Sequence, residues 1–504
     1  MPDGGTYTDW AKQLAESQQA FWAAAAKAPA FADASAFAPP DWQAFDGFAS
    51  KMLAQLDLGT GPDWQAAHAA LTAYRNVIMD SWSRIQRDFE TQRLALQGLG
   101  DPDWRIFRDR WFQIAEAEFI RTQRSEAFLV AQRDLLRAAI AAWSHIPDHA
   151  RNSAMEGLAT AQTAVQTAMD LGLAKVQVAK TPKKEIWRHG RTSLSRYLPL
   201  DGRAPSLGPV VLCHGLIGRQ TMTDLQPDRS LVRNLLAAGV DVFVVDWGNA
   251  GSEDRDLGID HFAGNMVGAC LAQTSEASGK KPILFGICQG GTIAACHTAR
   301  YPGRIAGLIT AVAPFDFHAA KDDPDPAHGL LHLWIESLDR EDIDALVGLT
   351  GNLSGVLLGM IFNQLNPVRT LRKYAVDMVE QAGAPGGPRI FVAMEKWLAD
   401  RPDLPGAVAR TWLKDLYMNN ALFCRDLLLN GEKVDLSAIN VPTLNVFASN
   451  DHIVPPPCSR ALGCKISANY QELAVPTGHI GAFVSAGAQT LLSTSITSWL
   501  ATLR

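Results

Sequence analysis

Five short runs of apolar residues most constrain the fold of the second half of this chain. Each run is rich in Val, Ile, Leu and Phe, and helical patterns separate most of them. Runs of this kind are typical of strands buried on both faces, which occur in parallel sheets covered by helices. They lie at 208–215, 240–248, 281–287, 305–312 and 443–449. We therefore predict an α/β domain, built on a parallel sheet, over residues 184–504.

The segments between these runs predict the helices around the sheet. Residues 260–278 have the pattern of one helix that covers the sheet. The interval from 313 to 442 is too long for a single crossover between two strands, and much of it is helical and partly apolar in pattern. We therefore predict a helical cap, inserted over the sheet at about 316–438.

The first 150 residues have a different, helical character. Eight of the 14 tryptophans of the chain precede residue 150. Asp101 is predicted to cap a helix whose first residue is Pro102. Apolar residues then recur at helical spacing, namely Trp104, Phe107, Trp111 and Ile114. We predict an all-α domain at 1–150 and a helical linker at 151–183. The aromatic stripe can be a helix-bundle core, or a surface for a partner, an apolar polymer or a lid.

Composition narrows the class of protein further. The net charge of -6 and the pI near 6.1 argue against a nucleic-acid-binding protein, which would carry a basic domain. No apolar run approaches the roughly 18 residues of a membrane span, and the N-terminus lacks a signal-peptide pattern. The seven cysteines include no C-x-x-C pair, which indicates reduced thiols in a cytosol rather than disulfides or a zinc site.

Residues 286–290 read Gly-Ile-Cys-Gln-Gly, where many hydrolases carry serine in the middle. The motif stands between a predicted strand and a predicted helix, which is the setting of a nucleophile elbow. The turn is sharp, so its flanking positions must be small, and Gly286 and Gly290 satisfy this requirement. The N-terminal end of the following helix favours a thiolate at Cys288. We interpret Cys288 as a nucleophile on an α/β-hydrolase fold, rather than as a structural cysteine at a strand end.

A nucleophile in this fold needs an acid and then a histidine, in that order along the chain. Asp451 follows the apolar run at 443–449, and His479 follows the last expected strand. We expect His479 to take the proton from Cys288, and Asp451 to orient His479 and stabilise its imidazolium. The rival histidine, His452, stands beside the acid and is expected at most to line the site.

Two backbone amides are the expected oxyanion donors. One is the N–H of Gln289, which directly follows the nucleophile. The His-Gly at 214–215 resembles the pair after the third strand of many hydrolases, where the backbone supplies a second donor, and Ile217 is the candidate for it. Asp246 and Asp254 are alternative acids, but they precede the nucleophile, so we interpret them as structural.

Four segments together closely resemble polyhydroxyalkanoate synthases, in particular the short catalytic subunit of the two-component class III type. They are "TDLQPDRSLVRNLLAAGVDVFVVDWG", "GICQGGT", "NDHIVPP" and "GHIGAFVS". The resemblance runs from about 181 to 504 and includes "EKWLADRPDLPGAVARTWLKDLYMNN" in the expected cap. It implies a catalytic triad of Cys288, Asp451 and His479. The chain departs from the family at Gly218, where Asn is expected, and at the His-Gly of 214–215.

The N-terminal half resembles the accessory subunit that the class III catalytic subunit needs. The segments that carry this resemblance are "TDWAKQLAESQQAFW" and "RDRWFQIAEAEFIRTQRSEAFLVAQRDLLRAAI". It implies that one chain fuses both subunits, so that the catalytic half carries its activator at high effective concentration.

The resemblance also implies a reaction. The substrate would be an (R)-3-hydroxyacyl-CoA, short-chain as in 3-hydroxybutyryl-CoA, which is polymerised into a polyester through a thioester on Cys288 with release of CoA. No cofactor or metal is expected, because no dinucleotide or phosphate-binding glycine motif stands in the right context, and coenzyme A is a substrate. The basic segment 180–191 can meet the CoA phosphates or form a solvated linker.

The expected partners are the growing polyester chain, the granule surface and a second copy of the chain, as a homodimer or a higher oligomer. We expect a cytoplasmic protein associated with polyester granules. The same residues are also compatible with two other functions. One is a cysteine-nucleophile polyester depolymerase or acyl-CoA thioesterase, because the fold alone does not separate transfer from hydrolysis. The other is a non-catalytic granule-binding protein, against which the intact triad argues.

Overall fold

The structure is a computed structural model, and it describes residues 62–97, 103–144, 176–202, 204–321, 323–377, 380, 387–466 and 469–503. The chain forms two compact units. The first unit holds the helices that precede residue 174 together with Ile361–Phe391. The second unit holds Lys175–Met360 and Val392–Arg504. The predicted linker at 151–183 lies outside the described residues up to 175.

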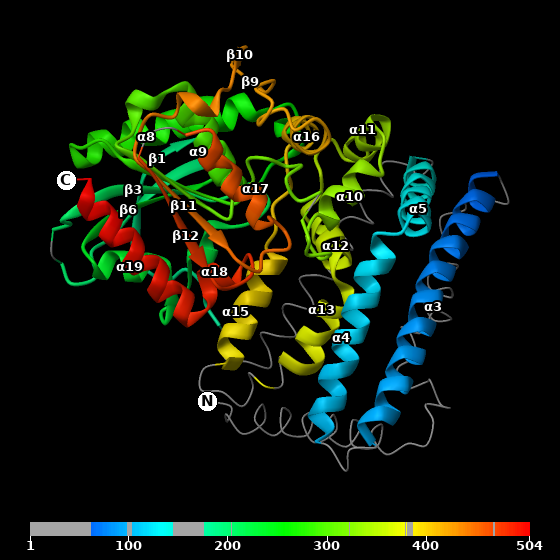
Figure 1. Ribbon diagram of the computed structural model, residues 1–504. Helices are drawn as coiled ribbons and strands as arrows, with labels where there is room; N and C mark the ends of the chain where they lie inside the picture. The colour runs from blue at the N-terminus through cyan, green and yellow to red at the C-terminus, as the bar shows by residue number, and fades with distance from the viewer. Residues whose placement is uncertain are drawn as a thin grey trace. The chain divides into compact units, whose positions relative to one another are not determined.

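An eight-stranded sheet forms the centre of the second unit (Figure 1). Its strands, in spatial order, are β1 (Lys183–His189), β2 (Thr192–Tyr197), β6 (Val240–Asp246), β3 (Leu207–Cys213), β7 (Ile283–Ile287), β8 (Gly307–Ala311), β11 (Thr443–Ala448) and β12 (Tyr470–Val475). From β6 to β12 every pairing is parallel, which confirms the predicted parallel sheet. Two two-stranded ribbons accompany the sheet, β4 (Asp224–Gln226) with β5 (Arg229–Ser230), and β9 (Leu428–Leu429) with β10 (Glu432–Lys433).

The edge formed by β1 and β2 is antiparallel and was not predicted. The interpretation of 180–191 as a solvated linker is therefore wrong for β1 (Lys183–His189), which pairs with β2. Most side chains of β1 are exposed and many are charged. Charged residues are common on edge strands, where they discourage pairing with another chain, and they hide the strand pattern in the sequence.

Helices cover both faces of the sheet (Figure 1). On one face lie α7 (Leu231–Ala237) and α19 (Ala486–Thr502), and on the other lie α8 (Val267–Ser278) and α9 (Gln289–Arg300). The helix predicted at 260–278 is present, but its first part, Asp260–Met266, is a π-helix that continues into α8. The short helices α17 (Pro456–Arg460) and α18 (Gly481–Val484) follow β11 and β12, respectively.

The segment predicted as a cap, 316–438, is largely helical. Its α-helices are α10 (Leu330–Glu336), α11 (Arg340–Gly348), α12 (Gly355–Leu365), α13 (Pro367–Arg372), α15 (Gly387–Ala399) and α16 (Gly406–Arg410). A π-helix at Thr411–Met418 follows α16. Residues 361–391 of this segment pack within the first unit. Where the cap begins and ends stays a prediction.

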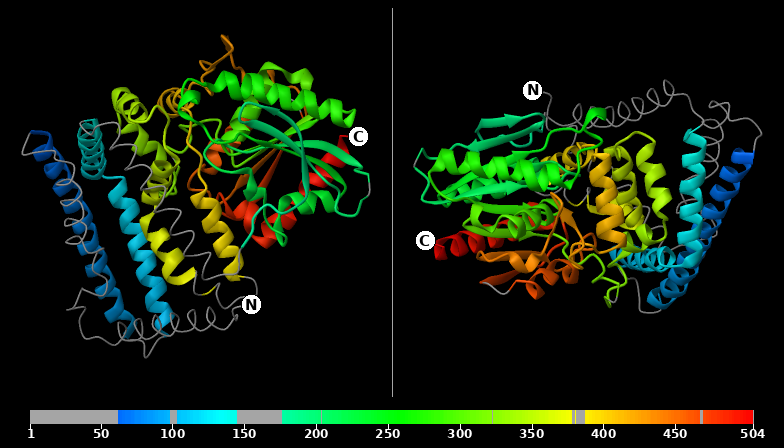
Figure 2. Two further views of the ribbon diagram at one scale, coloured as in Figure 1. Left: turned by 180° about the vertical axis from the view of Figure 1, so that it is seen from behind. Right: turned by 90° about the horizontal axis from the view of Figure 1, so that it is seen from above.

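Among the described residues of the first unit, three long helices and α13 carry most of the packing. The long helices are α3 (Pro62–Gln97), α4 (Trp104–Gln123) and α5 (Glu126–Ser144), seen with the other elements in two further views (Figure 2). Helix α4 is capped by Asp103, whose side chain accepts a hydrogen bond from the Arg105 N–H. The predicted N-cap, Asp101, and Pro102 lie outside the described residues. No helix in the described ranges is long and apolar enough to span a bilayer.

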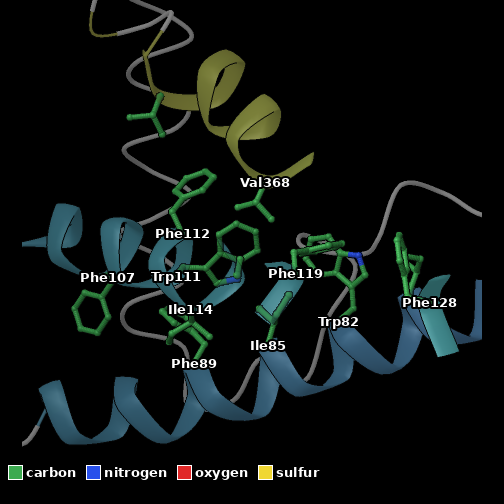
Figure 3. Packing of buried hydrophobic residues seen from close by; sticks show 13 residues of the cluster. Trp82, Ile85, Phe89, Phe107, Trp111, Phe112, Ile114, Phe119, Phe128 and Val368 are labelled. Atoms are coloured by element: carbon green, nitrogen blue, oxygen red, sulfur yellow. The ribbon is translucent and has the colours of Figure 1, made fainter. Parts of the chain in front are cut away.

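Aromatic side chains fill the core between these helices (Figure 3). Trp82 of α3 packs against Trp111 and Phe119 of α4, with ring centroids 5.8 Å apart in both pairs. Val368 of α13 belongs to the same buried cluster. The interpretation of the aromatic stripe as a helix-bundle core is confirmed for Trp82 and Trp111. The remaining tryptophans before residue 150 lie outside the described residues or have undescribed side chains.

This packing predicts a matched pair of variants on α4. Phe119 is 6% exposed and Ile106 is 48% exposed. Phe119→Ala should destabilise the first unit by about 3–5 kcal/mol, because it leaves a cavity beside Trp82. Ile106→Ala, on the same helix, should change stability by less than about 0.5 kcal/mol. Hydrogen exchange of the α3 and α4 amides measures both. Similar protection in the two variants would contradict the assigned core.

Candidate active site

Cys288 stands on a sharp turn between β7 and α9. Its backbone has φ 54° and ψ -128°, a conformation that residues other than glycine adopt rarely and at a cost of about 1–3 kcal/mol. The thiol is partly exposed, whereas Cys213, Cys270, Cys296 and Cys458 are buried. Strain of this kind persists only where the surrounding structure holds the residue in place.

Close backbone packing holds this turn. A Cβ atom added to Gly286 would collide with the carbonyl oxygen of Gly290, and one added to Gly290 would collide with the carbonyl oxygen of Cys213. Helix α9 therefore starts directly against the end of β3. As the first residue of α9, Gln289 has no acceptor for its N–H within the helix, so this amide remains available beside Cys288.

Asp451 and the partly buried His479 form a pair at the same edge of the sheet. Asp451 follows β11 and is fully buried, and His479 follows β12. The Nδ1–H of His479 donates to Oδ2 of Asp451 across 2.7 Å. The other oxygen, Oδ1, accepts from the N–H groups of Ile453 and Val454, each at 2.9 Å. Three donors thus fix the carboxylate and, through it, the orientation of the imidazole.

The electrostatics of His479 depend on this pairing. Burial by itself would lower the pKa of His479, because it disfavours the imidazolium. The Asp451 carboxylate and Cys288 outweigh that effect and raise the pKa of His479 well above its usual value. The interaction with Cys288 requires the sulfur to lie close to the imidazole, so the three side chains form one electrostatic unit.

The alternative acids have other partners. Asp246 accepts hydrogen bonds from Gln220 Nε2 at 2.9 Å and from the Gly248 N–H at 3.0 Å. Asp254 accepts from the Gly251 N–H at 2.7 Å and pairs with Arg191. Both carboxylates are thus engaged with neighbouring residues, which agrees with the interpretation of Asp246 and Asp254 as structural.

His452 directly follows Asp451 in the chain. It lines a mostly apolar cavity together with Phe317, Tyr417, Ile453, Val454 and Cys458. The pKa of the buried Tyr417 is raised, chiefly by its burial and further by the nearby Cys458, Cys288 and Asp451. The cavity therefore adjoins the residues of the site.

The loop after β3 carries the second expected oxyanion donor, Ile217. The N–H of Leu216 already donates to Oε1 of Gln289 at 3.1 Å, which ties this loop to the nucleophile turn. His214 is buried, and burial lowers its pKa to about 4, so its ring is neutral at pH 7. Its backbone oxygen accepts from Trp247 Nε1 at 2.8 Å.

The end of α15 and the residues after it hold the other side of this loop, a feature that the sequence did not reveal. Trp397 Nε1 donates to the carbonyl of Arg219 at 2.8 Å, and Arg401 Nη1 donates to the carbonyl of Ile217 at 3.3 Å. A Cβ atom at Gly218 would stand 3.1 Å from the His214 ring and 3.2 Å from the Trp397 ring. A side chain at 218 would therefore need one of these rings to shift by a few tenths of an ångström, so glycine suits this crowded position. The only signal in the sequence was the family resemblance of the segment that contains Trp397.

A family model and the curated relatives of the chain agree with this architecture. The family model of the alpha/beta hydrolase fold matches residues 208–486. The "Poly(3-hydroxyalkanoate) polymerase subunit PhaC" of Allochromatium vinosum is 38% identical over 334 residues, covering 66% of this chain and 91% of that protein. The protein of the same name from Thiocystis violacea is 34% identical, over 64% of this chain and 89% of that one. Among solved structures, a thermophilic esterase from Thermogutta terrifontis has a TM-score of 0.39 at 19% identity, covering 64% of this chain and 99% of that one.

The pairing of Asp451 with His479 makes a titration prediction. In Asp451→Asn the carboxylate charge is lost while the burial remains, so the pKa of His479 should fall from well above its usual value to below about 6.5. An NMR titration of the protein with ¹³C-labelled histidine measures it, and His479→Gln assigns the resonance. An unchanged pKa in Asp451→Asn would mean that another group holds the imidazolium.

Proposed function

The chain belongs to the poly(3-hydroxyalkanoate) polymerase PhaC family of the alpha/beta hydrolase fold, so it is an acyltransferase, and we propose that it polymerises short-chain (R)-3-hydroxyacyl-CoA through a thioester on Cys288. Two observations support this proposal. The chain covers 91% of the Allochromatium vinosum polymerase subunit. The Asp451–His479 pair, whose imidazole interacts with Cys288, offers a base for a thiol nucleophile.

In the proposed acylation, His479 Nε2 takes the proton of the Cys288 thiol. The thiolate sulfur attacks the carbonyl carbon of the acyl-CoA thioester, and a tetrahedral intermediate forms. The bond between this carbon and the CoA sulfur then breaks, and CoA leaves with the proton that His479 returns. Asp451 keeps the imidazole oriented and stabilises its charged form throughout.

The oxyanion of the intermediate would lie between two backbone amides. The Gln289 N–H has no acceptor within α9, and the Leu216 N–H is already bonded to the Gln289 side chain. This leaves Ile217 as the loop donor that we propose. Two preorganised amides stabilise such an anion strongly, because they need no reorganisation during the reaction.

In the proposed elongation, the hydroxyl of a second 3-hydroxyacyl group attacks the carbonyl of the acyl-Cys288 thioester. His479 accepts the hydroxyl proton, an oxoester bond forms, and Cys288 leaves as the thiol once the proton is returned. A thiol suits this cycle because one thioester replaces another in the first step, so the acyl group stays activated for the second. A serine ester would lose that free energy before the chain grows.

The same site would hydrolyse the acyl-enzyme if water replaced the hydroxyl. A depolymerase or a thioesterase therefore remains the second candidate function for the residues alone. We propose that the helical segments of the predicted cap exclude water. We further propose that the enzyme stays with its polymer granule because the growing chain is attached to Cys288.

The product decides between these two functions. Incubation with 3-hydroxybutyryl-CoA should yield insoluble polyester and free CoA, whereas a hydrolase would give the free hydroxy acid. Cys288→Ala should reduce CoA release at least about a thousandfold, and Cys288→Ser should be far slower than the native enzyme. The same substitution at Cys424, an exposed cysteine outside the site, is the matched control and should leave the rate unchanged. Residual fast CoA release by Cys288→Ala would show that another residue is the nucleophile.

We also propose that the first unit acts as a built-in accessory subunit. Its core includes Val368, and Gln123 Nε2 of α4 donates to the carbonyl of Gln364 at 2.6 Å. The first unit thus holds residues 361–391, which lie within the segment predicted as the cap. Helix α15 follows in the sequence. Near its C-terminal end it carries Trp397, whose Nε1 donates a hydrogen bond to the Arg219 carbonyl in the loop after β3. In this way, well-packed helices in the first unit would help to keep the loop that carries Ile217 in its position beside Cys288.

The pair of α4 variants tests the accessory role in the intact chain. Phe119→Ala should show a longer lag and a lower initial rate of CoA release, because its helical unit opens more often, while Ile106→Ala should resemble the native chain. Stopped-flow detection of CoA measures the lag. If Phe119→Ala is less stable in the first unit yet shows native kinetics, the unit has another role, such as granule binding.

A further inference from the structure

Two histidines and a glutamate gather in the second unit, and none of them takes part in the acyl transfer proposed above. Within the described ranges, His318, His332 and Glu336 are a group whose possible ligand atoms all lie within 4.8 Å of one another. His318 lies in the loop after β8, whereas His332 and Glu336 are on α10. Residues four apart on a helix share one face, so both α10 side chains can reach the same point.

His318 has a fixed tautomer. Its Nε2 lies 2.8 Å from the carbonyl oxygen of Tyr417, which can only accept a hydrogen bond, so Nε2 carries the proton. In the neutral ring the lone pair is then on Nδ1. A histidine that donates one N–H to a carbonyl and offers its other nitrogen is typical of metal ligands, because the hydrogen bond orients the ring.

His332 is a buried ring whose nitrogens are poorly satisfied. It is 3% exposed, and its Nε2 lies 3.1 Å from Oε2 of Glu336. Neither ring nitrogen makes a well-directed hydrogen bond to another described residue. A buried imidazole with unsatisfied nitrogens is costly for folding unless it gains a partner.

The third member of the group, Glu336, already forms an ion pair with Lys321. The ammonium of Lys321 lies 2.5 Å from Oε1 of Glu336, and this side chain is long and partly exposed. The Glu336 carboxylate therefore already binds one cation, and a more strongly bound cation can displace the flexible Lys321 side chain into solvent.

We propose that His318 Nδ1, His332 Nε2 and a carboxylate oxygen of Glu336 bind a zinc ion, with water as the fourth ligand. Two imidazoles and one carboxylate match the ligand preference of zinc, whereas magnesium and calcium prefer oxygen ligands alone. Binding needs the side chains to close from 4.8 Å to the roughly 3.4 Å between neighbouring ligands of a tetrahedral zinc. The ion would join the loop after β8 to α10.

Cysteine spacing gave no indication of such a site, because its ligands are two histidines and a glutamate. The proposed ion would border the cavity that His452 and Tyr417 line, because His332 lines it as well, but we assign it no step in the acyl transfer at Cys288. Its expected effect is a higher stability of the second unit in the presence of zinc, because a ligand that binds only the folded state stabilises it.

Zinc titration of the chelator-treated full-length protein tests the site. Isothermal calorimetry and metal analysis after dialysis should show one zinc more in the native chain than in His332→Gln. Glu336→Gln, at a partly exposed position that folding tolerates, should weaken this zinc at least about tenfold. Lys321→Gln should bind it several-fold more tightly, because the competing ammonium is gone. Cobalt substitution should give a spectrum without thiolate charge transfer, which separates this site from binding to the free cysteines.

His261→Gln is the matched control, since His261 is a half-buried histidine outside the group, and it should retain the same zinc content as the native chain. Equal zinc binding by the native chain, His332→Gln and Glu336→Gln would overturn the proposal. Weaker binding in Lys321→Gln would overturn it as well, because Lys321 would then help the ion rather than compete with it.

Discussion

Backbone crowding between the end of β3 and the start of α9 is the constraint on which the rest of the site depends. Gly290 lies so close to the Cys213 carbonyl that no side chain fits, and the chain can turn there only if Cys288 takes its unusual backbone conformation. The thiol then stands at the carboxyl ends of the parallel strands. The loops after β11 and β12 open at the same edge, so Asp451 and His479 meet it there.

The loop after β3, which carries the proposed oxyanion donor Ile217, is held from two sides. These contacts connect the predicted cap with the proposed active site. Gln289 of the nucleophile turn bonds one side, and Trp397 and Arg401 bond the other. A displacement of the segment that carries Trp397 and Arg401 would remove two hydrogen bonds from the loop and free the Ile217 amide to move. The departures at His214 and Gly218 lie within this arrangement, since the His214 and Trp397 rings both stand close to the Cα atom of Gly218 and crowd any Cβ there.

The two compact units share the segment that the sequence presents as one cap. Val368 and Val376 of this segment belong to the same buried cluster as side chains of α3 and α4, whereas the described residues before 361 and after 391 belong to the unit of the sheet. Large aromatic side chains pack closely between the described helices of the first unit. The proposed influence of this unit on the sheet domain would pass along the chain through α15, which is continuous from Gly387 to Ala399.

The sequence by itself determined the parallel strands, the turn at Cys288 and the positions of Asp451 and His479 after two of the strands, because these follow from local periodicity, glycine spacing and chain order. It misplaced the helix N-cap at Asp101, missed the charged edge strand β1, and gave no reason for Gly218. Only the tertiary structure decided which segments hold the oxyanion loop, and which histidines meet Glu336. Those contacts join residues far apart in sequence, such as Ile217 with Arg401, through side-chain packing that leaves no periodic pattern along the chain.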